Sequence, residues 1–242
     1  MPSGVIINSC SIFLGGIFGS LMGNKLNSKL KMELNLVFGL CSLCMGISSV
    51  VLMQNMPAVV FSIIVGTLIG LLIHLGSHIN KLAKGLQGII IKLFKNQNSD
   101  LSEDEFLNQL VTIIVLFCAS GTGIYGTLSL GMTGDSSILI SKSILDFFTA
   151  AIFACNLGYV VSAVSVPQFI IFFVLFLFSK MIFPLTTPTM INDFKACGGF
   201  LMIATGFRMM HLKNFPIADM LPAMVLVMPF SYVWVNYIVP LV

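Results

Sequence analysis

Eight long runs of apolar residues alternate with short polar stretches along the chain. Each run approaches the roughly 20 residues that a helix needs to cross the hydrocarbon core of a membrane. The pattern therefore predicts an all-α protein, a polytopic bundle of about eight transmembrane helices within a single domain over residues 1–242. The runs cover about residues 4–23, 36–53, 57–75, 107–127, 138–161, 166–183, 195–211 and 217–239.

Composition supports the lipid bilayer as the partner of these runs. The chain is 57% hydrophobic and 9% charged, whereas soluble domains are roughly 45–50% apolar and about 25% charged. The first residues, "MPSGVIINSC", contain no positive charge, and the apolar run that follows continues through Gly23. We therefore expect a retained first helix rather than a cleaved signal. The net charge of +3 is too small to indicate a nucleic-acid partner.

The polar stretches 24–35 and 76–106 carry lysines interleaved with leucine and isoleucine. This pattern is typical of amphipathic helices that lie at a membrane surface, and a solvated positive loop is the alternative. If the N-terminus is outside, nine of the twelve basic residues fall in inside loops. The positive-inside rule then predicts that both termini lie outside and that residues 76–106 lie inside.

A weak internal repeat relates the two ends of the chain. A shift of 160 residues aligns Gly39 and Gly46 with Gly199 and Gly206, and lays spans 1–3 over spans 6–8. The predicted repeats cover about residues 4–75 and 164–239, with a central helical hairpin at about 107–161. Because two helices intervene, the repeats would be inverted in the membrane, which is a common plan of secondary transporters. Helix packing alone is the alternative source of such glycine spacing.

Small residues at helical spacing predict close helix packing. Gly15, Gly19 and Gly23 are four residues apart, as are Gly66 and Gly70. Such glycines let helix backbones approach closely in lipid, where burial of apolar groups contributes little to association. They predict a compact bundle and are compatible with a homodimer.

Three charged residues lie in or beside the fifth apolar run. Lys142 and Asp146 are four residues apart and therefore share one helix face, where they can form an ion pair. Charges at this depth are costly and usually face a protein interior or a hydrated cavity, so we expect a substrate or ion site around Asp146. Asp135 precedes the helix, and two interpretations stay open for it: a helix cap and a site residue.

The fourth run contains the sequence "CASGTGIYG", which predicts a broken helix. Gly121, Gly123 and Gly126 weaken the helix, and a break exposes backbone groups that protein or water must satisfy. Ser120 and Thr122 add hydroxyl groups, so both are candidate ligands for a solute or ion. Asn8 in the first run is a further candidate, although a hydrogen bond between helices is the favoured interpretation for this residue.

The chain resembles the YqgA/YdfK-type family of bacterial polytopic membrane proteins. The resemblance rests on the opening "GVIINSCSIFLGGIFGSLMGNKL", the central "FCASGTGIYGTLSLGMTGDSSILISKSILDFF" and the closing "GGFLMIATGFRMMHLKNFPIADMLPAMVL". It implies an all-helical protein of the bacterial inner membrane. The family brings no catalytic residues to carry over.

Two classes of function follow from these patterns. The first is a secondary transporter or facilitator of a small polar or charged solute, which the repeat, the broken span and the intramembrane charges favour. The second is a membrane scaffold or regulator that acts through amphipathic cytoplasmic loops. We expect no enzyme, no cofactor and no metal site, because Cys41 and Cys44 form a C-x-x-C without a second pair or a nearby histidine.

Overall fold

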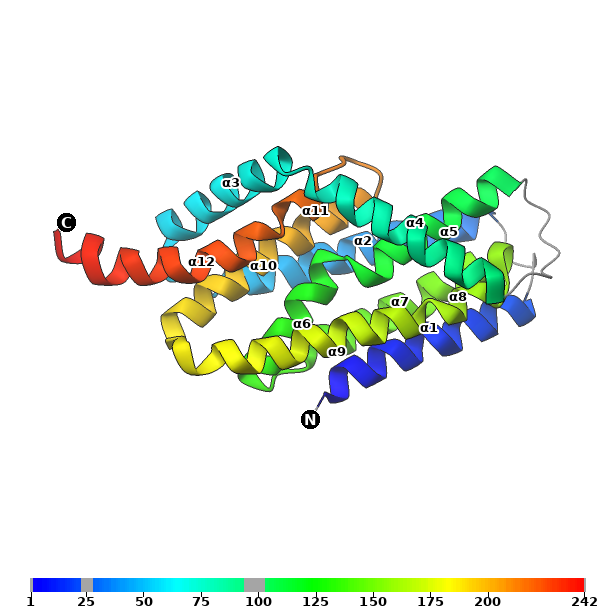
Figure 1. Ribbon diagram of the computed structural model, residues 1–242, viewed down its shortest axis with the longest axis horizontal. Coiled ribbons are helices and arrows are strands. Elements are labelled where there is room, and N and C mark those ends of the chain that lie inside the picture. The colour runs from blue at the N-terminus through cyan, green and yellow to red at the C-terminus, as the bar shows by residue number, and fades with distance from the viewer. Residues whose placement is uncertain (1, 23–27, 94–102, 242) are drawn as a thin grey trace. The chain divides into compact units, whose positions relative to one another are not determined.

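A computed structural model describes residues 2–22, 28–93 and 103–241, and this part of the chain is helical throughout, without strands (Figure 1). The helices are α1 (Ser3–Met22), α2 (Ser28–Val50), α3 (Met56–Leu72), α4 (Leu75–Leu93), α5 (Glu103–Cys118), α6 (Gly121–Thr133), α7 (Ser137–Leu157), α8 (Val160–Ala163), α9 (Ser165–Ile182), α10 (Pro188–Met209), α11 (Ile217–Met220) and α12 (Pro222–Val233). A 3₁₀ turn follows α9 at Phe183–Leu185, and a π-helical turn follows α12 at Trp234–Ile238.

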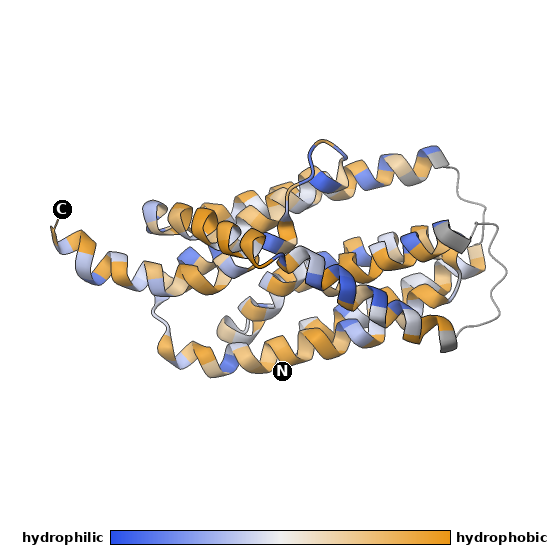
Figure 2. Ribbon diagram, turned by 45° about the horizontal axis from the view of Figure 1, so that its top comes forward, coloured by the Kyte–Doolittle hydropathy of each residue, from blue (hydrophilic) through white to orange (hydrophobic). Residues whose placement is uncertain are grey.

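The helices agree with the predicted all-α membrane bundle. Each of the eight predicted spans overlaps one helix or a run of consecutive helical segments. In the described part of the chain, six segments are long and apolar enough to cross a membrane, and seven if α3 and α4, which bend by 59°, form one span. Figure 2 shows how apolar the helices are, with hydrophilic residues gathered in short stretches. The chain is therefore a membrane protein in contact with a lipid bilayer.

The seventh span begins earlier than the sequence predicted. Pro184 lies in the 3₁₀ turn that ends the sixth span, but Pro188 starts α10 instead of ending the preceding helix. Thr187 is the N-cap, and its hydroxyl accepts a hydrogen bond from the Met190 N–H at 3.3 Å. Proline is favoured in the first turn of a helix because its missing N–H is not needed there. The predicted start at residue 195 was wrong, and Asp193 consequently lies inside the helix.

The described residues form two compact units. The first contains residues up to Asn35 together with His78–Ser179, and the second contains Leu36–Ser77 and Lys180 onward. The core of the first unit is formed by α1, α4, α5, α7 and α8, and includes the buried side chains of Ile12, Ile90, Phe117 and Leu157. Each unit thus combines two segments that are separated in the sequence.

In the first unit, glycines bring α1 against α7. A Cβ atom on Gly15 would overlap the carbonyl oxygen of Phe147, and one on Gly19 would overlap that of Ala151. The two backbones are therefore in direct contact, as small residues permit in membrane helices. The predicted close packing is confirmed at both glycines, and it lies within the chain rather than between two copies.

In the second unit, α2 and α10 cross through the predicted glycines. A Cβ atom on Gly39 would lie 2.9 Å from the carbonyl oxygen of Gly206, and one on Gly46 would lie 2.7 Å from that of Gly199. Between these contacts the Ser42 hydroxyl donates a hydrogen bond to the Met202 carbonyl at 2.9 Å. The helices are therefore antiparallel, and the hydrogen bond between them joins residues 160 apart in the sequence.

Candidate functional site

The fourth span is broken between α5 and α6. The last backbone hydrogen bond before the break runs from the Ala119 N–H to the Val115 carbonyl at 2.9 Å. Ser120 then adopts an extended conformation and caps α6, its hydroxyl accepting a hydrogen bond from the Gly123 N–H at 3.1 Å. A hydroxyl cap of this kind satisfies one of the backbone donors that a helix start leaves free. The predicted discontinuous helix is confirmed.

The break lies at Ala119 and Ser120, just before the predicted glycines. Gly121 is the first residue of α6, and Thr122 is buried in its first turn. Gly126 lies farther along α6, where a Cβ atom would come within 2.9 Å of Ile138 and 3.2 Å of Leu139. The assignment of Gly126 to the break was therefore wrong, because this glycine allows α6 to pack closely on the start of α7.

Lys142 and Asp146 form the predicted ion pair on α7. The Lys142 Nζ lies 2.5 Å from the Asp146 Oδ2, and the residues are 4% and 6% exposed. The spacing of four residues places both side chains over the same turn of the helix. Each of these two buried charges is stabilised by the other, because burying an unpaired charge at this depth would cost much more free energy.

Amide and hydroxyl side chains extend the ion pair into a network. The Asn8 Nδ2 donates to the Asp146 Oδ2 at 2.8 Å, and the Asn8 Oδ1 accepts from the Gln168 Nε2 at 2.8 Å. The Ser9 hydroxyl donates to the Gln168 Oε1 at 2.6 Å. These five side chains, which come from α1, α7 and α9, are 0–8% exposed. We refer to Asn8, Ser9, Lys142, Asp146 and Gln168 as the Asp146 network.

The broken span lies directly beside this network. A Cβ atom on Gly123 would come within 2.9 Å of the Lys142 Cε and within 2.8 Å of the Ser120 hydroxyl. The Lys142 ammonium also lies 6.0 Å from the ring centroid of Phe117 at the end of α5, close enough for a cation–π interaction. The end of α5, the start of α6 and the charged turn of α7 thus meet at one place.

Asp135 lies outside the network. Its carboxylate is exposed before the start of α7, where the Oδ1 accepts a hydrogen bond from the Ser137 N–H at 2.9 Å. A carboxylate is stabilised at the positive end of a helix, so this geometry matches the cap interpretation of the sequence.

Comparison with known proteins identifies the family. The family model "Protein of unknown function (DUF554)" matches residues 3–232. The chain belongs to the DUF554 family. It is 46% identical over 237 residues to the uncharacterized protein YqgA of Escherichia coli strain K12, covering 97% of this chain and 98% of YqgA. It is 24% identical over 229 residues to the uncharacterized membrane protein YdfK of Bacillus subtilis strain 168, covering 92% of this chain and 93% of YdfK.

No solved structure matches this DUF554 chain. The family match confirms the resemblance seen in the opening, central and closing stretches of the sequence. The name of YdfK agrees with the membrane protein that the helices indicate.

Two members of the network in this DUF554 protein were missed by the sequence reasoning. Ser9 and Gln168 lie in apolar runs, where an isolated polar residue does not stand out. A signal was nonetheless present, because Gln168 lies 160 residues after Asn8, the same shift that relates the two ends of the chain. Asn8 itself bridges α7 and α9, so the predicted hydrogen bond between helices is confirmed.

A second buried carboxylate lies in the other unit of this DUF554 protein. Asp193 on α10 is 0% exposed. Its Oδ1 accepts hydrogen bonds from the backbone N–H groups of Gln54 and Asn55 at 2.8 and 2.9 Å. Its Oδ2 accepts from the Asn55 Nδ2 at 2.8 Å and from the Ser231 hydroxyl at 2.6 Å. We refer to Asp193, Gln54, Asn55 and Ser231 as the Asp193 cluster.

Proposed function

We propose that this protein is a secondary transporter or facilitator of a small polar or charged solute, with its site at the Asp146 network. The observation that carries the proposal is the buried Lys142–Asp146 pair beside the break between α5 and α6. Broken helices and intramembrane charges are a recurring arrangement around the sites of transporters, because both supply polar groups at membrane depth.

The packing within each unit supports the proposed inverted repeat. In the second unit α2 and α10 cross at Ser42 and Met202, and in the first unit α1 and α9 meet at Asn8 and Gln168. Both pairs are 160 residues apart, which is the shift that aligns the glycines in the sequence. A two-fold axis in the membrane plane brings equivalent residues together in this way. Repeats of this kind would allow the two sides of the membrane to be opened in turn.

The side chains of the Asp146 network bind one another, so a solute would have to replace some of these hydrogen bonds. The hydrogen bonds between its members join side chains, so rotamer changes can exchange them. The Ser9 hydroxyl also lies 3.0 Å from the Val5 carbonyl oxygen of its own helix. The ion pair carries no net charge. A solute that bound only Asp146 would leave Lys142 without a counter-charge, so we infer that the solute carries both signs or enters together with a counter-ion.

The proposed location is the bacterial inner membrane, with both termini outside. The proposal rests on the two relatives, which come from bacteria, and on the lysine bias of the loops. A scaffold that acts through the amphipathic loops is the alternative function, favoured by the exposed Lys81 and Lys84 of α4. A scaffold does not require the charge pair at membrane depth, so the two functions predict different effects of Asp146.

The test is a thermal-shift screen of the purified protein with amino acids, organic acids and monovalent cations, followed by uptake into proteoliposomes. Asp146→Asn should abolish the ligand-dependent rise in melting temperature and the uptake, while the protein still inserts into membranes. Asp135→Asn is the matched control and should respond as the wild type does. A ligand response that is equal in Asp146→Asn and wild type would overturn the proposed site.

A further inference from the structure

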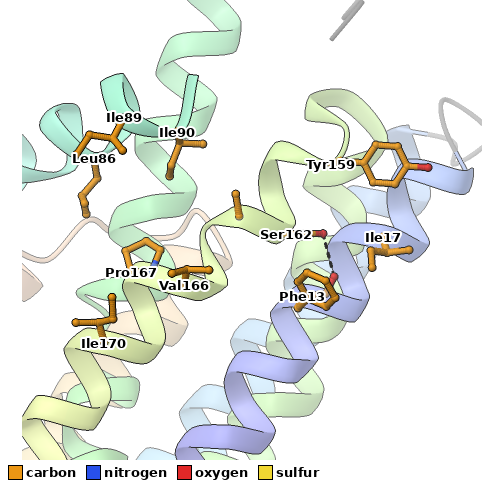
Figure 3. A pocket seen from close by; sticks show the side chains of 11 residues that line it. Phe13, Ile17, Leu86, Ile89, Ile90, Tyr159, Ser162, Val166, Pro167 and Ile170 are labelled. Atoms are coloured by element: carbon orange, nitrogen blue, oxygen red, sulfur yellow. Dashed lines mark hydrogen bonds between the residues drawn. The ribbon is translucent and has the colours of Figure 1, made fainter. Parts of the chain in front are cut away.

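A groove in the first unit lies between α4 on one side and α1, α8 and α9 on the other, away from the Asp146 network (Figure 3). Its volume is about 720 Å³, within the usual range of small-molecule sites. The walls are apolar and include Phe13, Leu86, Val166 and Ile170. No member of the Asp146 network lines the groove.

The Ser162 hydroxyl in the groove wall does not require a hydrogen bond from a ligand. Ser162, which lines it, donates its hydroxyl hydrogen to the Phe13 carbonyl at 2.9 Å. A ligand would therefore gain binding free energy from apolar contacts with this wall rather than from hydrogen bonds. Val166 and Ile89 are each 60% exposed in the chain, so the groove opens on the side that faces lipid.

The ends of the groove differ in their depth in the membrane. Figure 3 shows Tyr159 at one end and Ile170 towards the other. Tyr159 follows Gly158, whose positive φ of 71° marks the turn between α7 and α8. Turns between spans lie at the membrane surface, and tyrosine is enriched at that level. The groove thus runs from the headgroup level at Tyr159 into the hydrocarbon layer along α9.

The wall formed by α4 has a positive outer face. Leu86 and Ile90 point towards the groove or the core, whereas Lys81 and Lys84 are exposed on the opposite face of the same helix. An amphipathic helix with this pattern lies at the interface and attracts anionic headgroups. The helix therefore presents apolar side chains to the groove and lysines on its outer face, which suits a molecule with a long apolar tail and a negative head.

We propose that this groove is a binding site for one acyl chain of an anionic phospholipid, whose headgroup lies beside the lysines of α4. The size of the groove favours a lipid chain over a helix of a partner protein. A helix about 10 Å across fills about 700 Å³ with only about six residues, too few for a transmembrane contact. An extended acyl chain is narrow enough to lie along the groove from Tyr159 to Ile170.

The first experiment fills the groove. Full-length protein is washed in mild detergent, and retained phosphatidylglycerol is counted by mass spectrometry. Val166→Trp should lose this lipid, because the new ring occupies the groove. Val174→Trp is the matched control, since it makes the same change on α9 at an exposed position that does not line the groove. Equal retention in both variants would overturn the proposal.

The second experiment tests the headgroup. Phosphatidylglycerol in nanodiscs should raise the melting temperature of the wild type more than phosphatidylcholine does. The double variant Lys81→Gln/Lys84→Gln should lose that difference, while Lys180→Gln should keep it. A wild type that melts equally in both lipids would refute the anionic headgroup.

A third measurement uses the unaltered protein, so it does not depend on the folding of a variant. Phosphatidylglycerol with a photoreactive acyl chain should label peptides from α4, α8 and α9 around the groove. Labelling spread evenly over all exposed apolar faces would contradict the proposed occupant.

Discussion

The two buried carboxylates of this protein, Asp146 and Asp193, are held in different ways. Asp146 is paired with the Lys142 ammonium and with the side-chain amide of Asn8. Asp193 accepts four hydrogen bonds from neutral donors, two of which are backbone N–H groups that precede α3. Both carboxylates are almost inaccessible to solvent. Burial alone therefore does not separate the proposed site residue from a residue that only stabilises the fold.

The two carboxylates differ in the kind of group that donates hydrogen bonds to them. Backbone N–H groups at Gln54 and Asn55 cannot turn away without moving the loop between α2 and α3, so Asp193 fixes that loop to α10. The partners of Asp146 are side chains that can rotate to other partners. We interpret the Asp193 cluster as a rigid connection between this loop and α10, and the Asp146 network as the part that can rearrange. The predictions below test this difference.

The largest loss of stability is expected for Lys142→Met. The substitution leaves the Asp146 charge buried without a counter-charge, which typically costs about 3–5 kcal/mol. The double variant Lys142→Met/Asp146→Asn should lose less than the sum of the two single variants, because the pair is removed together. The free energy of unfolding in detergent measures both effects. Lys180→Met on an exposed lysine is the control, and additive losses would show that the two residues act independently.

Asp193→Asn should cost about 2–3 kcal/mol, because the new amide nitrogen faces donors that it cannot satisfy. We expect folded Asp193→Asn protein to keep the ligand response and the uptake, because this carboxylate connects two segments of the second unit and does not belong to the proposed site. Asp135→Asn is the control, because asparagine caps a helix as well as aspartate does. Loss of uptake in Asp193→Asn at unchanged stability would reverse the interpretation of the two carboxylates.

Gly19→Ala should destabilise the first unit by about 2 kcal/mol, a usual value for overpacking. The added methyl group overlaps the Ala151 carbonyl and would push α1 away from α7, which also separates Asn8 from Asp146. Gly88→Ala on α4 is the matched control, because no atom lies within 4 Å of the added methyl group. A Gly19→Ala protein as stable as Gly88→Ala would argue against direct contact between the two backbones.

The smallest effect is expected for Ser9→Ala, at about 1 kcal/mol for the lost hydrogen bond to Gln168, because the second bond of this hydroxyl goes to the Val5 carbonyl of its own helix. The loss leaves the Gln168 Oε1 without its donor and should loosen the outer end of the Asp146 network. Ser11→Ala is the control, because the exposed Ser11 hydroxyl bonds only to the Ile7 carbonyl of its own helix. If both variants have equal melting curves and equal uptake, Gln168 does not depend on Ser9.

Much of the fold was predictable from local patterns. Apolar runs near the length of a membrane crossing located the helices, including the six or seven described segments that are long and apolar enough to cross a membrane, because lipid requires every spanning segment to satisfy its own backbone. The break in the fourth span followed from glycine and serine at membrane depth, and the Lys142–Asp146 pair followed from a spacing of four on one helix. These features depend on residues close together in the chain.

Other features depend on which helices become neighbours. Periodicity could not show that Gly15 and Gly19 face α7 rather than a second copy of the chain, because glycine permits either contact. The start of α10 could not be located from the sequence, because Pro188 can follow one helix or begin the next. The structure shows that Asp193 is buried by partners from the loop before α3 and from α12.

The sequence by itself determined the class of protein, the approximate positions of most helices, the broken helix and the charged pair, since each arises from the cost of placing polar groups in lipid. Only the tertiary structure decided that Asn8, Gln168 and Ser9 complete the environment of Asp146, and that Asp193 joins three segments of the second unit. The physical reason is that a buried polar group must find donors and acceptors within reach, and that reach is set by helix packing across more than 100 residues of chain.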